Sequence, residues 1–157
     1  MFVVLGCNAG DLYAFDTSRF TLLATLSEKF VLAKEKGSIG FIASTHFGLE
    51  NFLDSYTRQL YRSIGVTRYG RSIGENMQEA AQKFISTGYT FEGYMHAEQS
   101  TLNGDPAIKV NSQPNPDFAV ESSQIRINPN IVSVADDKFT VKAYLYNLGK
   151  ATGDDKD

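Results

Sequence analysis

The sequence has little cysteine, no tryptophan and no excess of positive charge. Cys7 is the one cysteine in the 157 residues, and a single thiol excludes an intrachain disulfide framework. Fifteen basic residues stand against 18 acidic ones, and this balance argues against nucleic acid as a partner. The apolar runs are far shorter than the roughly 20 residues of a membrane-spanning helix, so we expect no membrane span.

The composition is that of a globular protein. Hydrophobic residues make up 42% of the chain and charged residues 21%, which is enough apolar surface for one sizeable core. Phenylalanine and tyrosine supply the aromatic content, with 11 and 8 residues. We therefore expect an ordered domain, with room for a second, smaller module.

The first 45 residues contain the pattern of a βαβ unit. Residues 2–5 form a continuous apolar run, typical of a strand buried on both faces of a parallel sheet. Ser27 is a candidate N-cap and Gly37 a stop signal, which predicts a helix over 27–36. The segment "SIGFIAST" then predicts a second strand over 38–45. This order implies a parallel sheet covered by helices.

Helical spacing of apolar residues dominates the next segment. It predicts a long helix over 49–64 and another over 74–86. Residues 88–103 fit no single element, and the turn residues in "NGDPAIKV" predict a turn into a short strand over 103–110. Helices and strands are thus mixed as far as Val110.

The composition changes after Val110. The Pro/Asn-rich stretch "NSQPNPD", residues 111–117, indicates a linker between domains. Beyond it, residues 118–127 and 138–147 predict strands, too few for an independent sandwich. We therefore expect the chain to begin and end within larger structural elements and to be a fragment.

Candidate chemistry gathers at the ends of the first two predicted strands. Cys7 follows one strand, and Ser44, Thr45 and His46 follow the other. In an open α/β sheet, ligands bind at the carboxyl ends of the strands, so these residues would line one crevice. There the Cys7 N–H would be free to stabilise an oxyanion, while the thiol would need a neighbouring base to act as a nucleophile.

A plainer interpretation stands beside this one. Free cysteine is among the most buried residue types, so Cys7 also fits simple core packing. His46 and His96 fit surface or hydrogen-bonded positions better than catalytic ones. One cysteine and two distant histidines have no metal-ligand spacing, so we expect no metal site and no cofactor.

The order and separation of four blocks resemble a known family. They are "FVVLGCNAGDLY" (2–13), "GSIGFIAST" (37–45), a long amphipathic helix and "LNGDPAIKV" (102–110). Together they resemble the C-terminal half of a gingipain-type cysteine peptidase domain, over residues 1–110. The segment 118–157 resembles the start of an immunoglobulin-like β-sandwich that is incomplete.

The resemblance implies a fold and a set of roles. The fold would be a partial caspase-like α/β sandwich, with a parallel sheet and helices on both faces. Cys7 matches the position of the family's nucleophile, and its backbone N–H would donate to the oxyanion. Ser44 and Thr45 match a loop that borders the substrate pocket, and we add His46 to it. The family's base is a histidine of a His-Gly pair that precedes the cysteine, and no histidine precedes Cys7.

Three functions follow from this comparison. The first is a fragment of a secreted or surface-attached cysteine endopeptidase that acts on proteins or peptides, with its histidine base upstream of this chain. The second is a non-catalytic protein of the same architecture that acts in secretion, adhesion or protein binding, with secretion machinery or cell-surface partners. The third is another caspase-fold hydrolase, against which the downstream β-module argues.

Overall fold

The computed structural model describes residues 1–12, 25–88, 91–111, 113–134 and 137–151. Parts of the segments predicted at 88–103, at 111–117 and at the C-terminal end of the chain fall outside these residues. The chain divides into two compact units, Met1–Val110 and Asn111–Asp157, and each is described separately below. Among the described residues, no helix combines the length and the apolarity needed to cross a membrane.

A three-stranded sheet organises the first unit. Its order is β1 (Phe2–Val4), β2 (Gly40–Ser44), β3 (Ser100–Gly104). β1 runs parallel to β2, whereas β3 runs antiparallel to β2, so the sheet is mixed. The prediction of a parallel sheet is therefore right for β1 and β2 and wrong for β3. The central strand β2 is buried along its whole length, as its apolar sequence requires.

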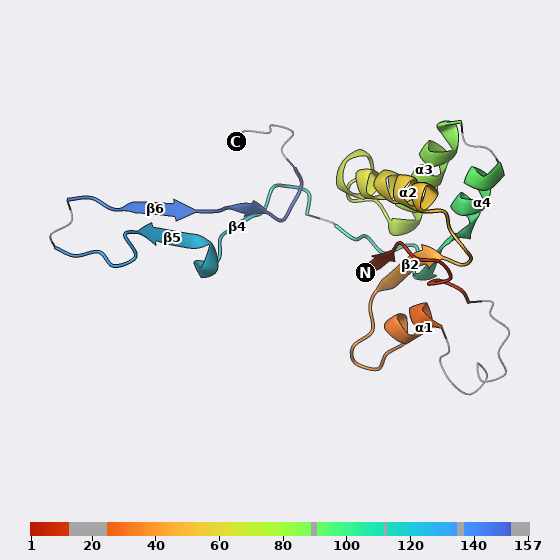
Figure 1. Ribbon diagram of the computed structural model, residues 1–157, viewed down its shortest axis with the longest axis horizontal. Helices are drawn as coiled ribbons and strands as arrows, with labels where there is room; N and C mark the ends of the chain where they lie inside the picture. Colours follow the sequence, from red (N-terminus) through yellow and green to blue (C-terminus); the bar gives the residue numbers. More distant parts are fainter. Residues whose placement is uncertain (13–24, 89–90, 112, 135–136, 152–157) are drawn as a thin grey trace. The chain divides into compact units, whose positions relative to one another are not determined.

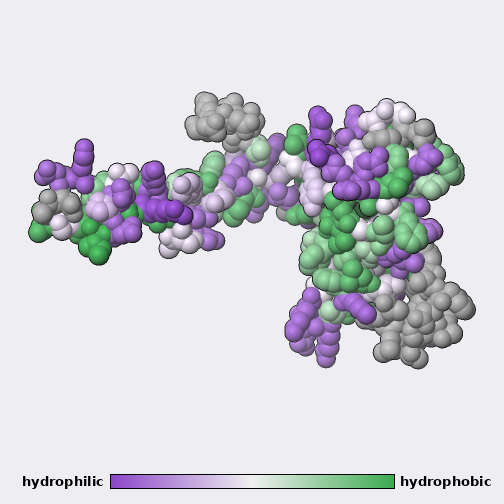
Figure 2. Space-filling view, viewed as in Figure 1, coloured by the Kyte–Doolittle hydropathy of each residue, from purple (hydrophilic) through white to green (hydrophobic). Residues whose placement is uncertain are grey.

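β1 is an edge strand, which corrects the expectation that residues 2–5 are buried on both faces. Among the described residues it pairs with β2 on one side only, and Phe2 and Leu5 are exposed. Figure 2 shows apolar side chains gathered over this part of the surface. An apolar run indicates a buried strand only where both neighbouring strands are present.

The connection between β1 and β2 contains the short helix α1 (Leu26–Val31). Its N-cap is Thr25, not Ser27: the Thr25 side chain accepts from the Glu28 N–H, and the Glu28 carboxylate reaches back to the Thr25 N–H. The reciprocal capping box outcompetes Ser27, which lies buried inside the first turn. The helix also ends at Val31, earlier than predicted.

Three helices follow β2. They are α2 (Glu50–Arg62), α3 (Ile73–Ser86) and α4 (Phe91–Gln99). The first two confirm the predictions over 49–64 and 74–86, while the ambiguous 88–103 region contains α4 and then β3. A short π-helix, η2 (Ser63–Thr67), follows α2, and Ser72 caps α3 in a second capping box with Glu75.

The helices occupy the two faces of the sheet, as Figure 1 shows. Neighbouring residues of β2 point to opposite faces, so Phe41 meets α1 and Ile42 meets the helices on the other side. The rings of Phe2, Phe30 and Phe41 contact one another on the α1 face. The core on the other face consists of Ile42, Tyr56, Leu60, Ile73, Ala80, Phe84 and Ala97.

The segment after β3 forms a turn, as "NGDPAIKV" predicts, but begins later and lacks a full strand. Asn103 and Gly104 still belong to β3, and the turn starts at Asp105, whose carboxylate accepts from the Ala107 N–H at 2.8 Å. A single bridge between Ser72 and Lys109 replaces the predicted strand.

The second unit contains two separate two-stranded ladders. β4 (Phe118–Ala119) pairs with β7 (Tyr146–Asn147), and β5 (Ile125–Asn128) pairs with β6 (Thr140–Ala143), both antiparallel. Each of the two predicted strands is thus broken into two short pieces. In β5–β6 one face is apolar, and the other places Arg126 directly opposite Lys142. None of the described residues of this unit is buried.

Candidate functional site

Cys7 lies in a tight turn immediately after β1. Asn8 adopts the left-handed conformation, with φ of 56°, and the Asp11 N–H donates to the Asn8 carbonyl at 3.2 Å. The Cys7 side chain is exposed, so the interpretation of this residue as core packing is wrong. Among the described residues, the Cys7 N–H makes no hydrogen bond.

The turn docks against the end of β2. The Asn8 N–H donates to the His46 carbonyl at 3.1 Å, and the Gly10 N–H donates to the Ser44 carbonyl at 2.9 Å. A side chain at position 10 would place its Cβ 2.8 Å from the Ala43 carbonyl oxygen, which explains the glycine. The two strand ends therefore meet, as the sequence predicts.

The Cys7 sulfur contacts the loop that follows β2. Gly48 is its partner: the Gly48 N–H approaches Sγ to 3.5 Å, and Sγ approaches the Gly48 carbonyl oxygen to the same distance. The two residues are 41 positions apart, so only the fold brings them together. The thiol thus meets backbone groups, and neither described histidine makes a hydrogen bond to it.

Ser44 and Thr45 support this loop in different ways. Ser44 is buried, and its hydroxyl donates to the His46 carbonyl oxygen at 2.9 Å. Thr45 is half-buried, and its N–H donates to the Gln99 carbonyl oxygen at 2.9 Å. Ser44 therefore supports the loop from its buried side, while Thr45 lies at the surface beside His46.

His46 is exposed, and its ring contacts the next residue of the same loop. Nδ1 accepts the Phe47 N–H at 2.7 Å, and the His46 and Phe47 rings lie 5.3 Å apart. Nδ1 therefore has no proton in this arrangement, and the ring proton of the neutral side chain is on Nε2. The interpretation of His46 as a surface residue agrees with this position.

His96 is buried on α4 and uses both ring nitrogens. Nε2 accepts the Leu49 N–H at 2.8 Å, and Nδ1 lies 2.6 Å from the Glu92 carbonyl oxygen. The ring also lies 4.7 Å from that of Phe52. The interpretation of His96 as a hydrogen-bonded residue is confirmed, but nothing in the sequence links it to Leu49, 47 positions away.

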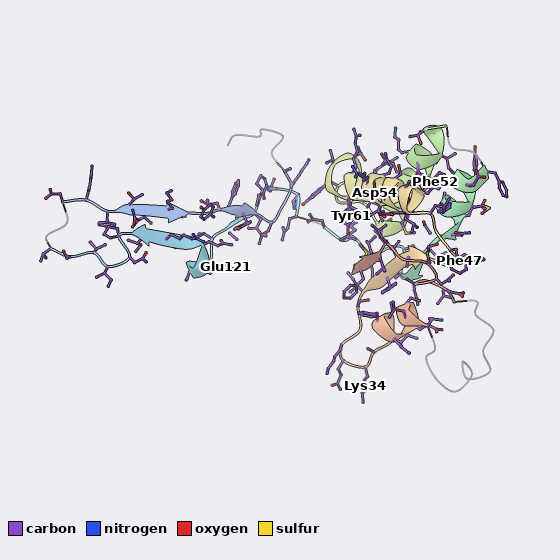
Figure 3. All side chains as sticks on the ribbon, viewed as in Figure 1. Lys34, Phe47, Phe52, Asp54, Tyr61 and Glu121 are labelled. Carbon is purple, nitrogen blue, oxygen red and sulfur yellow. The ribbon has the colours of Figure 1, made fainter. Side chains whose placement is uncertain are left out.

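Two hollows border the contact between Cys7 and Gly48. One, of about 550 Å³, is lined by Asn8, Asp11, Thr45, His46, Phe47 and Gln99. The other, of about 430 Å³, is lined by Leu5, Gly6, Cys7, Gly48, Glu50, Leu53 and Asp54. Figure 3 labels Phe47 and Asp54, which belong to the loop and to α2. The predicted Thr45 and His46 thus lie in one hollow, and the thiol lies in the other.

Acidic side chains give the Cys7 hollow its charge. Glu50 and Asp54 come from the first turns of α2, and Asp54 also accepts a hydrogen bond from the Arg58 guanidinium at 2.8 Å. Among the described residues, no group of three or more His, Cys, Asp or Glu side chains is arranged to hold a metal ion. Sequence reasoning missed these two carboxylates, because they read as the solvated side of an amphipathic helix.

Comparison with known proteins places this site in a family. The model of the family described as peptidase family C25 matches residues 1–111, which include the sheet, its helices and Cys7. Comparison with curated proteins gave no match, and neither did comparison with solved structures. The match covers well over half of the chain and agrees with the resemblance in the four sequence blocks. The chain therefore belongs to peptidase family C25, the gingipain family, whose family-level function is that of a cysteine peptidase.

Proposed function

We propose that this chain is part of a cysteine endopeptidase in which Cys7 is the nucleophile. The observation that carries the proposal is the position of the thiol: exposed, in the turn after β1, and facing a hollow. Active-site cysteines need access to substrate, whereas structural cysteines are typically buried and inert. Membership of peptidase family C25 supplies the class of chemistry.

The reaction would proceed through a thioester. A histidine base takes the proton from the Cys7 thiol, and the thiolate sulfur attacks the carbonyl carbon of the scissile peptide bond. The C–N bond then breaks, and the leaving amine takes the proton from the imidazolium. Water hydrolyses the thioester, which releases the carboxylic acid and restores the thiol. The Cys7 N–H has no partner among the described residues and would donate to the oxyanion.

The substrate would lie along the two hollows. Thr45 and His46 line one of them, and they would contact substrate on that side. Ser44 would act indirectly, because its buried hydroxyl supports the His46 carbonyl instead of reaching the hollow. The fold around these residues would be one part of a caspase-like sandwich.

The base would come from a segment N-terminal to Cys7 in a longer polypeptide. Neither described histidine makes a hydrogen bond to the thiol: His96 uses both ring nitrogens, and His46 uses Nδ1, in hydrogen bonds to the backbone. The outer edge of β1 is unpaired among the described residues, and the exposed Phe2 lies beside it. A preceding strand that ends in His-Gly would pair with this edge and bring its histidine toward the end of β1.

The second unit fits a module outside the catalytic part. Its β5–β6 ladder has an apolar face that an immunoglobulin-like sandwich would cover with further strands. Such a module would serve secretion or attachment at the cell surface, with secretion machinery or surface proteins as partners. The commitment of His46 and His96 to backbone hydrogen bonds also favours a second function, a non-catalytic member of the family that binds protein.

The test compares the chain alone with a version extended by its upstream coding sequence. Each is assayed on a labelled protein substrate of mixed sequence, beside Cys7→Ala and beside a substitution of any histidine in an upstream His-Gly pair. We expect activity only in the extended version, and we expect its loss in both variants. Hydrolysis that survives Cys7→Ala would remove Cys7 as the nucleophile. An extended polypeptide without activity or without His-Gly would support the non-catalytic function.

A further inference from the structure

The buried His96 joins α4 to the loop at residues 46–49. Its side chain is 4% exposed, and it accepts the Leu49 N–H through Nε2. Nδ1 lies within hydrogen-bond distance of the Glu92 carbonyl oxygen, one turn earlier on the same helix. Because Nε2 accepts, Nδ1 carries the proton and donates to that carbonyl.

Only a neutral ring can make these two bonds together. One nitrogen has to donate and the other has to accept, so a single tautomer of imidazole satisfies both sites. Phe52 holds the ring plane in place, with ring centroids 4.7 Å apart. A buried polar side chain satisfied at both ends fixes the two segments that it joins.

The loop that His96 holds is the one that contacts Cys7. Leu49 follows Gly48, whose N–H and carbonyl oxygen both lie 3.5 Å from the Cys7 sulfur. Phe47, the next residue back, lines the hollow on the other side of that contact. A displacement of Leu49 would therefore move Gly48 away from the thiol and change the shape of both hollows.

We propose that His96 is a positioning residue that holds the 46–49 loop against Cys7 through its hydrogen bond to the Leu49 N–H. It acts through the loop and does not touch the thiol. The proposal deepens the function proposed above, on which its catalytic consequence rests. Its structural part, the control of the Cys7 environment, holds for the chain by itself.

A matched pair of substitutions separates the two hydrogen bonds. Glutamine at position 96 places an amide oxygen near the position of Nε2, where it accepts the Leu49 N–H. Asparagine is shorter, so its amide replaces Nδ1 opposite the Glu92 carbonyl and leaves the Leu49 N–H without an acceptor. His46→Asn, on the exposed side of the same loop, serves as the control for loss of an imidazole.

The readouts are amide hydrogen exchange at Leu49 and the rate at which iodoacetamide alkylates Cys7. In His96→Asn we expect both rates to rise roughly fivefold, the effect of losing one neutral hydrogen bond. We expect His96→Gln to return both toward the parent values and His46→Asn to leave Leu49 exchange unchanged. The proposal would be overturned if a folded His96→Asn variant had the exchange and alkylation rates of the parent chain. It would also be overturned if both rates in His96→Gln were as high as in His96→Asn.

A measurement on the unchanged chain covers the case in which His96→Asn does not fold. Nuclear magnetic resonance detects a scalar coupling between the Leu49 backbone nitrogen and His96 Nε2 when the hydrogen bond exists. Its absence in the folded chain would overturn the proposal.

These readouts need no peptidase activity, so they stand even if the Cys7→Ala test contradicts the proposed function. Where the extended polypeptide is active, we expect His96→Asn to raise KM more than it lowers kcat, since the loop borders the substrate and takes no part in bond cleavage. An equal fall in kcat and kcat/KM would contradict the positioning role.

Discussion

At the scale of single residues, burial and local hydrogen bonds set the acid–base behaviour of the helical layer. Burial raises the pKa of the Tyr56 hydroxyl to about 12. Burial also raises the pKa of the Glu79 carboxyl, but hydrogen bonds from Thr67, Arg68 and Ser63 and the charge of Arg68 outweigh it, so the net shift is downward. The phenol is thus held neutral and the carboxyl is held ionised.

Tyr56 provides a prediction at high pH. Because its folded pKa lies above the ordinary value of about 10, the fold gains stability from the neutral phenol below pH 10. That contribution is lost as the pH rises from about 10 to about 12. Absorbance at 295 nm should show a late phase of tyrosine ionisation, and Tyr56→Phe should remove this phase. Absence of the late phase in the folded chain, or its persistence in Tyr56→Phe, would contradict the prediction.

At the scale of elements, α2 and α3 hold the core together through aromatic contacts. Phe84 on α3 is fully buried and meets Phe52 and Tyr56 of α2 edge-on, with centroid distances of 6.3 and 5.9 Å. Phe52 in turn contacts the His96 ring. The packing between these helices therefore continues, through shared residues, to the loop beside Cys7.

Truncation of Phe84 tests this packing. Phe84→Ala removes a fully buried ring, and such changes cost about 3–5 kcal/mol of unfolding free energy. Urea denaturation followed by circular dichroism measures the loss. Phe91→Ala is the matched control, because Phe91 is exposed on α4 and should change stability by less than about 0.5 kcal/mol. Equal effects of the two substitutions would contradict the assignment of the core.

Sequence patterns predict elements whose signals are local. The spacing of apolar residues is enough for α2 and α3, and the apolar run "GFIAS" is enough for β2. At α1, two hydroxyl residues compete for the cap, and the spacing of Thr25 and Glu28, which is that of a capping box, selects Thr25. For α4, the apolar positions are too weakly periodic to distinguish a helix from a strand.

The candidate site divides in the same way. The meeting of the turn that contains Cys7 with residues 44–46 follows from the βαβ pattern, because parallel strands end at the same edge of a sheet. The contacts of Gly48 and His96 do not, because each joins residues more than 40 positions apart through loop geometry. The exposure of β1 depends on whether a second strand pairs with its outer edge. The residues of β1 themselves do not indicate whether such a strand is present.

At the scale of the whole molecule, the two units differ in how they resist unfolding. Met1–Val110 has a buried core on one face of its sheet and an aromatic cluster on the other. Asn111–Asp157 has no buried residue among those described, and its ladders have two strands each. Two-stranded ladders without a covered face are marginal in water.

Limited proteolysis tests this difference. We expect a protease of broad specificity to cut within residues 113–134 and 137–151 first and to leave a resistant fragment that ends near Val110. Mass spectrometry of the products at increasing digestion times identifies the cuts, and hydrogen exchange of β2 and β5 gives an independent comparison. Early cuts within α2 or α3, or slower exchange in β5 than in β2, would contradict the prediction.

The register of β5 and β6 has a consequence for their response to salt. Arg126 and Lys142 lie directly opposite each other on the polar face, so pairing the two strands brings like charges together. Dissolved ions weaken this repulsion as the Debye length shortens, from about 10 Å at 0.1 M ionic strength to about 3 Å at 1 M. The pairing of β5 with β6 should therefore become more stable as sodium chloride is added. The exposed ion pair of Arg58 and Asp54 on α2 should become weaker in the same titration.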